Sequence, residues 1–566
     1  MARRSSWSMR ERAFRGALEE LMPHVSMILR NSRMHAAVVM TSAMVGCAAP
    51  PESKQGSPEP DGAAASASAL RANDRHPRRG HGHGHGHGAA SCNDHNPCTL
   101  DTRVRWACVH APAPYGPPPS RGRNRCGEGE VCDGHGACVE PGAPLWSVSF
   151  PGEASFASIN ADGASNVLLT GQLSGTADLG GGPLTSAGQR DVLIAKLDPD
   201  GELVWARRYG GPGDEFGAKI AALSDGSLVN AGGYVDSLDV GAGPIPSAGL
   251  SDIYVMRTDP AGDPAWVRHF GDPAYQDVYG LSVDGEDNVV VLGSFEGTVD
   301  FGAGPVSSAG AQDIFLFKLD PAGNTLWSKG VGSEFSDSSV ALTTDPIGNV
   351  IFGGSVGTGA DLGDGPLPGP RVFVAKLDPA GNHVWSRTFG DTSSVIQDVE
   401  ADPAGNVVLV GQTGVTIDLG TGPITNEGYD AAFLAKLDAA GNTVWSRGFS
   451  APQSRVVITS IDVDSQANVV ASGVLVADVS ATLDFDGIPF PSGYNPSSYS
   501  ARTFLVKLDA GGHVLWVEGF DTERPFSIVV DPRDRVLATA TFTGTLDLGS
   551  GPLTGDEDVF VAAFGP

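Results

Sequence analysis

The chain has 566 residues, more than one ordinary domain of about 100–200 residues needs, so we expect several structural units. Its 76 Gly and 40 Pro residues are too many for a helical protein, whereas a hydrophobic fraction of 41% is enough for a core. Short strands joined by tight turns satisfy both conditions, because Gly and Pro favour turns and break helices. The formal net charge of −29 argues against nucleic-acid binding, because acidic surfaces repel phosphates, and is compatible with solubility, cationic partners or divalent metals.

Residues 1–47 have the pattern of an export signal. A flank that contains Arg30 and Arg33 precedes the apolar run 36–45, which is too short to span a bilayer as a helix. The alternative, a short buried apolar segment, finds no partner element in the low-complexity sequence that follows. Because a long stretch precedes the run, we expect translation to start at Met27 or Met34.

The apolar run ends in Met-Val-Gly-Cys, and this ending resembles a bacterial lipobox. The resemblance implies transfer of a diacylglycerol to the thiol of Cys47 and cleavage just before it. Cys47 would then be the acylated N-terminus, and the membrane a partner through this lipid anchor. We therefore expect an exported protein attached to the bacterial cell envelope, at the outer membrane or the cell surface.

Residues 48–90 form a low-complexity linker, rich in Pro and Ala, that offers little to a core, and we expect it to be a disordered tether. It contains four histidines that alternate with glycine: His81, His83, His85 and His87. Imidazole groups on so flexible a backbone could wrap a transition metal such as Zn²⁺. The competing interpretation is a repeat-expanded linker, because closing the tract on a metal costs considerable chain entropy.

Residues 91–140 contain the other six cysteines of the chain: Cys92, Cys98, Cys108, Cys126, Cys132 and Cys138. An even set in so short a segment predicts a disulfide-stapled module, which requires an oxidising compartment and so agrees with export. The spacing does not match a zinc site. Six cysteines allow 15 pairings, and the sequence does not choose among them. The segment resembles the small cysteine-rich modules of myxobacterial surface proteins.

From residue 144 to residue 566 the chain repeats three short motifs, with a period of about 60 residues. The motif Lys-Leu-Asp-x-x-Gly-x-x-x-Trp begins at Lys196, Lys318, Lys376, Lys436 and Lys507, with a variant at Arg257. The motif Asp-Leu-Gly-x-Gly-Pro, with conservative changes, begins at Asp178, Asp239, Asp300, Asp361, Asp418 and Asp547, with a degenerate copy at Asp484. The third, Asp-x-x-x-Asn-Val, is clearest at Asp345 and Asp402. Seven copies result.

Each copy predicts four strands, in one case 384–389, a segment near 395–399, 406–410 and 432–437. The last two are continuous apolar runs, which indicates sheets covered on both faces. Four-stranded sheets that cover one another in this way are the blades of a β-propeller. We interpret the recurring aspartates as caps of tight turns rather than as Ca²⁺ ligands, because no loop carries a full calcium-binding pattern.

The two ends of the repeat region complement each other. It opens on a Trp strand, 145–150, without a preceding Lys-Leu-Asp strand, and it ends on the missing partner, 558–564. Pairing of these segments would complete the last blade and close the ring, whereas a linear solenoid would need caps that the sequence lacks. We therefore predict an all-β protein: a seven-bladed propeller of four-stranded blades, after a small disulfide-rich module and a disordered tether.

The repeated pattern Lys-Leu-Asp-Pro-x-Gly-x-x-x-Trp-Ser-(Arg/Lys) closely resembles the SBBP repeat, the seven-bladed β-propeller repeat family, over residues 144–566. The resemblance implies the propeller fold and a place outside the cytoplasm, often in bacterial surface proteins. It implies no catalytic site.

The sequence leaves two hypotheses for function. The first is a lipid-anchored, monomeric module that binds or scaffolds an envelope protein or an extracellular glycan. The sixth unit favours it, because its longer loop offers Tyr494 and Tyr499 for stacking, although a tolerated insertion is the simpler interpretation. The second is a polysaccharide lyase or hydrolase that uses paired carboxylates at the mouth of the ring. We assign no catalytic residue and no resident cofactor, although Ca²⁺ or a metal on the His tract stays an option.

Overall fold

The computed structural model describes residues 99–104, 107–112, 131–132 and 138–566, apart from 391–392, 478 and 494–499. Every regular element in these ranges is a β-strand. The described residues include no helix, and so none with the length and apolar character that crossing a membrane requires. Two antiparallel pairs lie in the predicted cysteine-rich module: β1 (Thr99–Val104) with β2 (Ala107–Pro112), and β3 (Val131–Cys132) with β4 (Cys138–Val139).

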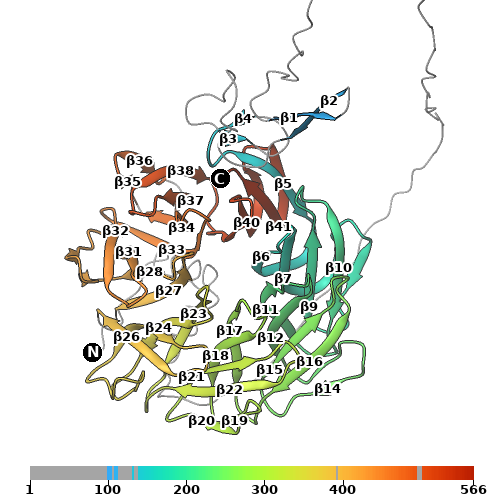
Figure 1. Cartoon of the computed structure of the whole chain (residues 1–566), viewed down its shortest axis with the longest axis vertical. Coiled ribbons are helices and arrows are strands. Elements are labelled where there is room, and N and C mark those ends of the chain that lie inside the picture. The colour runs from blue at the N-terminus through green and yellow to red at the C-terminus, as the bar shows by residue number, and fades with distance from the viewer. Residues whose placement is uncertain are drawn as a thin grey trace, which may run out of the picture. The chain divides into compact units, whose positions relative to one another are not determined.

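Seven antiparallel sheets follow one another around a ring (Figure 1), which confirms the predicted seven-bladed propeller. The first four blades, from the innermost strand outward, have the following strands. Blade 1 has β6 (Gly152–Ala161), β7 (Val167–Asp178), β9 (Asp191–Leu197) and β10 (Leu203–Tyr209). Blade 2 has β11 (Glu215–Ala222), β12 (Leu228–Tyr234), β15 (Asp252–Thr258) and β16 (Pro264–Phe270). Blade 3 has β17 (Gln276–Val283), β18 (Val289–Phe295), β21 (Asp313–Leu319) and β22 (Thr325–Val331). Blade 4 has β23 (Ser338–Thr344), β24 (Val350–Val356), β25 (Arg371–Leu377) and β26 (His383–Phe389).

The remaining three blades repeat this order. Blade 5 has β27 (Ser394–Ala401), β28 (Val407–Thr413), β31 (Ala431–Leu437) and β32 (Thr443–Phe449). Blade 6 has β33 (Ser454–Val463), β34 (Val469–Ala477), β37 (Ser500–Leu508) and β38 (Val514–Phe520). Blade 7 has β39 (Ser527–Val530), β40 (Val536–Asp547), β41 (Pro552–Phe564) and, as its outermost strand, β5 (Pro144–Phe150).

The ring closes as the sequence predicts. Strand β5 pairs with β41 in antiparallel register, with Val148 opposite Val561 and Trp146 opposite Ala563. Strands from both ends of the propeller region therefore complete one sheet. The repeat unit and the blade are offset by one strand, because the Trp strand that opens each unit is the outermost strand of the preceding blade.

The core lies between blades rather than inside a single layer. Most buried residues of a blade lie on its second and third strands, and in blade 3 both of these strands, β18 and β21, are buried along their whole length. One apolar cluster joins blades 2 and 3 and contains Phe295, Phe301 and Phe317, all with 0% exposure. Another joins blades 5 and 6 around Phe485 and Phe504. A blade therefore buries both of its faces only when it has a neighbour on each side.

The recurring aspartates cap turns, as the sequence predicts. In the Asp-Leu-Gly motif, the Oδ1 atom of Asp300 accepts the N–H groups of Gly302 at 2.8 Å and Gly304 at 3.0 Å. Most copies of this motif form a small flanking hairpin, an element that the sequence did not predict. These hairpins are β13 (Ser237–Leu238) with β14 (Ile245–Pro246), β19 (Thr298–Asp300) with β20 (Pro305–Ser307), β29 (Ile417–Asp418) with β30 (Pro423–Ile424), and β35 (Thr482–Phe485) with β36 (Ile488–Pro491), while β8 (Pro183–Thr185) pairs with β7.

A buried ion pair recurs in five blades, between the lysine of the third strand and the aspartate of the turn after the innermost strand. The Nζ to Oδ2 distances are 2.8 Å for Lys196–Asp162, 2.7 Å for Lys318–Asp284, 2.7 Å for Lys376–Asp345, 2.9 Å for Lys436–Asp402 and 2.9 Å for Lys507–Asp464. Burial alone would raise the pKa of Asp284, but hydrogen bonds from Lys318 and Asn288 outweigh it and hold this pKa below its ordinary value. Lys318 also donates to the carbonyl of Pro379 in the next blade.

The tryptophans of the motif connect neighbouring blades through hydrogen bonds. Six indole N–H groups donate to a turn carbonyl of the following blade at 3.0–3.2 Å, from Trp146, Trp205, Trp266, Trp327, Trp385 and Trp445. The motif glycine makes room for the ring. A Cβ atom on Gly441, whose φ is +80°, would lie 2.8 Å from the indole of Trp385. Within the described residues, the N–H of Trp516 has no partner, at the junction where the two chain ends meet.

In blade 7 the aspartate of the inner turn binds an arginine instead of a lysine. Its third strand has Ala563 where most other blades have the lysine. Arg535, with 0% exposure, instead donates to Asp531 and to the carbonyl of Pro199 at 2.6 Å. Its guanidinium therefore replaces the missing ammonium group from a neighbouring strand. The sequence carries the signal for this exchange, because both positions depart from the repeat, but a motif count alone does not pair them.

We predict that Lys318→Met lowers the free energy of unfolding by about 3–5 kcal/mol, because it leaves the buried carboxylate of Asp284 without its counter-charge. The double variant K318M/D284N should recover most of this loss, since an Asn side chain can still cap the turn. Chemical denaturation measures both values. Arg533→Met, at an exposed site of the equivalent turn in blade 7, is the control and should stay within about 0.5 kcal/mol of the wild type. Equal effects of the two single substitutions would contradict the role of the buried pair.

Candidate functional site

Most residues that the sequence singles out lie outside the described residues. These are Cys47, the four histidines of the linker, the side chains of Cys92, Cys98, Cys108, Cys126 and Cys132, and the two tyrosines Tyr494 and Tyr499. Cys138 is described and takes part in a disulfide. The pairing of the six cysteines stays a prediction, as do the lipid anchor and the metal-binding tract. A site can therefore be built only from the propeller.

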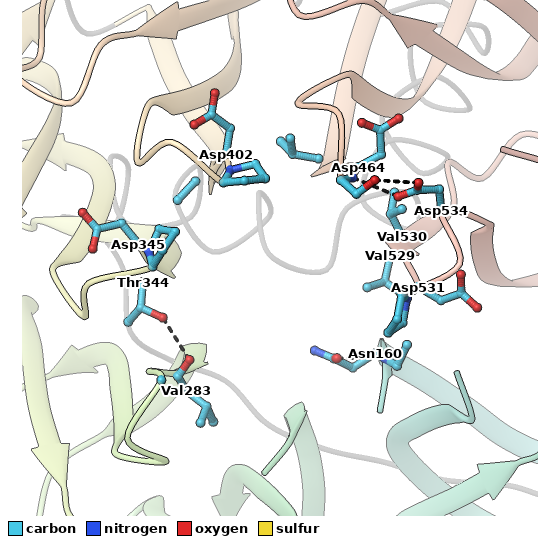
Figure 2. Close-up of a pocket in the computed structure, with 18 of the residues that line it drawn as sticks. Asn160, Val283, Thr344, Asp345, Asp402, Asp464, Val529, Val530, Asp531 and Asp534 are labelled. Atoms are coloured by element: carbon cyan, nitrogen blue, oxygen red, sulfur yellow. Dashed lines mark hydrogen bonds between the residues drawn. The ribbon is translucent and has the colours of Figure 1, made fainter. Parts of the chain in front are cut away.

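One end of the ring carries a cavity of about 490 Å³, here called the mouth cavity. It is lined by the turns that follow the innermost strands in blades 3 to 7, together with Asn160 and Ala161 of blade 1. Figure 2 shows Asn160 pointing into the opening, whereas the carboxylates of Asp345, Asp402 and Asp531 turn away from it.

The aspartates around the mouth cavity turn away because the fold already uses them. The Oδ1 atom of Asp402 accepts the N–H groups of Ala404 and Asn406, both at 2.9 Å, and its Oδ2 atom pairs with Lys436. Burial raises the pKa of Asp402, but hydrogen bonds from Lys436 and Asn406 outweigh it and keep this pKa below its ordinary value. The pKa of Asp345 is lowered in the same way, by Lys376 and Asn349, so these two bonded carboxylates are not available as proton donors or nucleophiles. The aspartates around the mouth cavity therefore act as turn caps.

Three other carboxylates, here called the channel carboxylates, lie on innermost strands, which surround the central channel of the ring (Figure 1), and the sequence did not predict them as a group. Asp398 and Glu400 belong to β27 and Asp462 to β33, the innermost strands of blades 5 and 6. Asp398 accepts the N–H of Ile461 at 3.0 Å across the blade junction. Asp462 accepts the N–H of Val530 in the same way, at 2.6 Å. These side chains therefore satisfy backbone donors at the free inner edges of the neighbouring blades.

The three channel carboxylates hold protons more tightly than usual. Each keeps some contact with the channel, but the flanking blades surround it, and this desolvation raises the pKa of Asp398 to about 6 and that of Asp462 to about 7. Burial, followed by the charges of Asp462 and Asp398, raises the pKa of Glu400 well above its ordinary value. The positive charge of Lys219, from blade 2, lowers the pKa of Asp398 and so opposes the effect of burial.

The three channel carboxylates can attract a cation when they are ionised, and they can supply a proton when they are neutral. Among the described residues, however, no group of three or more His, Cys, Asp or Glu side chains has the arrangement of a metal site. The inner strands carry a bulge just before these positions, between Ile396 and Asp398 in β27 and between Ile458 and Ser460 in β33. Such bulges re-aim the following side chains, which a sequence pattern does not reveal.

The seven four-stranded blades place the chain in the broad class of propeller-forming repeat proteins. No family model matches it. The chain is 22% identical over 448 residues to the uncharacterised WD repeat-containing protein L264 of Acanthamoeba polyphaga mimivirus, a match that covers 63% of this chain and 32% of the viral protein. It is 27% identical over 321 residues to the regulatory protein FlaEY of Caulobacter vibrioides, covering 53% and 32%. The chain thus spans about a third of the length of these curated relatives.

The solved structures that resemble this chain differ in what they do. The WD40 domain of Neurospora crassa Pan2 has a TM-score of 0.35 at 10% identity, over 75% of this chain and 98% of that one. The polysaccharide lyase Uly1 has a TM-score of 0.38 at 8% identity, over 72% and 89%. At TM-scores below 0.5, neither neighbour says what this chain does. The resemblance to the SBBP repeat family stays a prediction.

We predict that the propeller loses thermal stability as the pH rises from about 4 to about 7, because the channel carboxylates are protonated in the folded state and lose these protons over that range. Because folding raises the pKa values of these carboxyl groups, their protonation stabilises the folded state fully at a pH below their unfolded pKa of about 4. This stabilisation is lost as the pH rises through their folded pKa values. Glu400→Gln mimics the protonated form and should raise the melting temperature at pH 8 by a few degrees, with little effect at pH 4.5. Glu427→Gln, at an exposed position, is the control. A melting temperature of the Glu400→Gln variant that tracks the wild type at every pH would contradict the assignment.

Proposed function

We propose that this chain is an exported, lipid-anchored envelope protein whose propeller binds or scaffolds a protein or a glycan. The observation that carries the proposal is the mouth cavity, a concave surface whose walls are fixed before any ligand arrives. Capped turns and buried ion pairs hold each wall segment, as in the contact of Lys376 with Asp345 at 2.7 Å. Preformed surfaces of this kind bind with little loss of conformational entropy.

The mouth cavity is large enough for a short segment of a polysaccharide or a polypeptide. A volume of about 490 Å³ is within the usual range of about 300–1,000 Å³ for ligand sites, and it accommodates a few sugar or amino-acid residues. Its lining offers backbone groups and the amide of Asn160, which can hydrogen-bond to either kind of ligand, whereas the hydroxyl of Thr344 already donates to the carbonyl of Val283 at 3.0 Å. The bonded state of the surrounding aspartates favours binding over chemistry at this end of the ring.

The sequence alone supports the envelope location and the lipid anchor, through Cys47 and the six further cysteines. Mass spectrometry of the protein expressed in a bacterium with a lipoprotein pathway should find a mature N-terminus at Cys47 that carries a diacylglycerol. Cys47→Ser should abolish the modification and move the protein from the detergent phase to the aqueous phase. Cys138→Ser, which leaves the lipobox intact, is the control for the modification. An unmodified N-terminus upstream of Cys47 would refute the anchor.

We predict that Asn160→Trp reduces ligand binding at least about tenfold, because the Asn160 side chain points into the mouth cavity (Figure 2) and an indole there would fill it. A glycan array and a pull-down from envelope extracts provide the two assays. Ala265→Trp, on the exposed outer strand β16, is the matched control and should bind like the wild type. Equal binding by both variants would show that another surface makes the contact.

The channel carboxylates favour a second candidate function, a polysaccharide hydrolase or lyase. A carboxylic acid whose pKa lies near 7, as burial gives Asp462, can donate a proton to a leaving group at neutral pH. Against this role, both oxygen atoms of Asp462 accept backbone N–H groups, from Val463 and Val530. A reducing-sugar release assay separates the two functions: turnover that Asp462→Asn and Glu400→Gln abolish would favour the enzyme, and binding without turnover would favour the module.

A further inference from the structure

Two junctions between blades contain buried carboxyl pairs whose oxygen atoms are not all bonded. At the junction of blades 1 and 2, Asp191 and Glu215 both have 0% exposure. At the junction of blades 3 and 4, Asp313 and Asp337 have 2% and 0% exposure. In each pair one acid opens the third strand of a blade, and the other lies at or just before the start of the next innermost strand. All four lie at the ends of the strands opposite to the mouth cavity.

The geometry of the first pair brings the two carboxyl groups together over a glycine. A Cβ atom on Gly210 would lie 2.4 Å from Oε2 of Glu215 and 2.7 Å from Cγ of Asp191, so both groups pack on this residue. Asp191 accepts the N–H of Ala187 and a guanidinium N–H of Arg208, and Glu215 accepts the N–H of Gly211 at 3.0 Å. The Oδ1 atom of Asp191 and the Oε1 atom of Glu215 have no partner.

The second pair repeats this arrangement. Gly332 makes room for Asp313, because a Cβ atom there would lie 2.2 Å from its Oδ1 atom. Asp337 accepts N–H groups of Ser333 and Gly357, and Asp313 accepts that of Ala309. The Oδ1 atom of Asp313 has no partner among these donors.

Other junctions between blades have different residues at the positions of the two acids. Between blades 2 and 3, Gln276 stands where Glu215 stands one blade earlier, so the fold accepts a neutral amide at this position. Between blades 5 and 6, Ala431 and Val456 occupy the two positions, and the glycine is replaced by Ser450. The glycine alone does not mark a pair, because Gly390 remains between blades 4 and 5, where Arg371 and Ser394 occupy the two positions.

Two ionised carboxylates do not fit into one buried site, because their repulsion is barely screened there. Burial, the nearby Asp191 and the nearby Asp214 raise the pKa of Glu215 to about 7, against the opposing hydrogen bond from Gly211 and the charge of Arg208. Asp214 is itself paired with Arg190, and Tyr254 also lies within reach of the charge on Glu215. Burial and Asp337 raise the pKa of Asp313 to about 6.

We propose that each pair shares one proton and acts as a pH-dependent latch for the loops on this face of the propeller. In the protonated form one carboxyl group donates to the other, and both keep their loop N–H groups in place. These loops are residues 187–190 and 210–214 at the first junction and 332–336 at the second. Loss of the proton leaves two carboxylates close together, with Arg208 bound to Asp191 at the first junction, and the loops that they cap loosen while the blades remain paired.

Hydrogen exchange of the full chain, read by mass spectrometry at pH 5.5 and pH 8 and corrected for the intrinsic rate, tests the latch. In the wild type, protection of residues 187–190 and 210–214 should fall at least about tenfold at the higher pH. In Glu215→Gln this fall should disappear at the first junction and persist at 332–336, since the amide can both donate to Asp191 and accept from Gly211. In Asp313→Asn the reverse should hold.

The junction of blades 5 and 6 is the internal control, because it lacks both acids. Residues 426–430 and 450–454 should show the same corrected protection at both pH values. A fall of equal size there would mean that the pH change loosens the whole ring, and the latch would be rejected. It would also be rejected if the wild-type loops at the two acidic junctions kept their protection, or if both variants retained the wild-type pH dependence.

Discussion

Each blade of this protein is a sheet that buries both faces, and this constraint governs the rest of the structure. A sheet with two apolar faces needs a neighbour on each side, so a row of such sheets is stable only when its ends meet. The chain meets this requirement by pairing β5 with β41. Between successive blades another contact repeats around the ring. An indole N–H and a buried cation of one blade donate hydrogen bonds to turn carbonyls of the next blade, as Trp327 and Lys318 do at Pro379.

The repeated residues could be interpreted from the sequence because each one performs the same local task in every copy. The Trp, the Gly beneath it and the turn-capping Asp recur at fixed spacing, and their roles follow from general turn and packing chemistry. The pairing of the two terminal strands was predictable for the same reason, since each lacked the partner that every other copy has. The Lys–Asp pair was not predicted, because its members lie in different motifs and only the folded blade brings them together.

The candidate site could be predicted much less well, because it consists of departures from the repeat. Asp398, Glu400 and Asp462 lie on the innermost strands, where no motif marks them and where a bulge decides how the side chains point. Arg535 replaces a lysine that belongs to another strand, so the compensation is visible only in three dimensions. A repeat fixes the scaffold, and the positions that differ between copies give each junction its own chemistry.

The most direct test of ring closure is native-state hydrogen exchange of the β5 amides, residues 145–150, as a function of denaturant. If β5 completes blade 7, these amides exchange only through global unfolding, with the same free energy and the same denaturant dependence as residues 559–564 of β41. Exchange of β5 through a local opening of low free energy, while β41 stays protected, would contradict a closed ring.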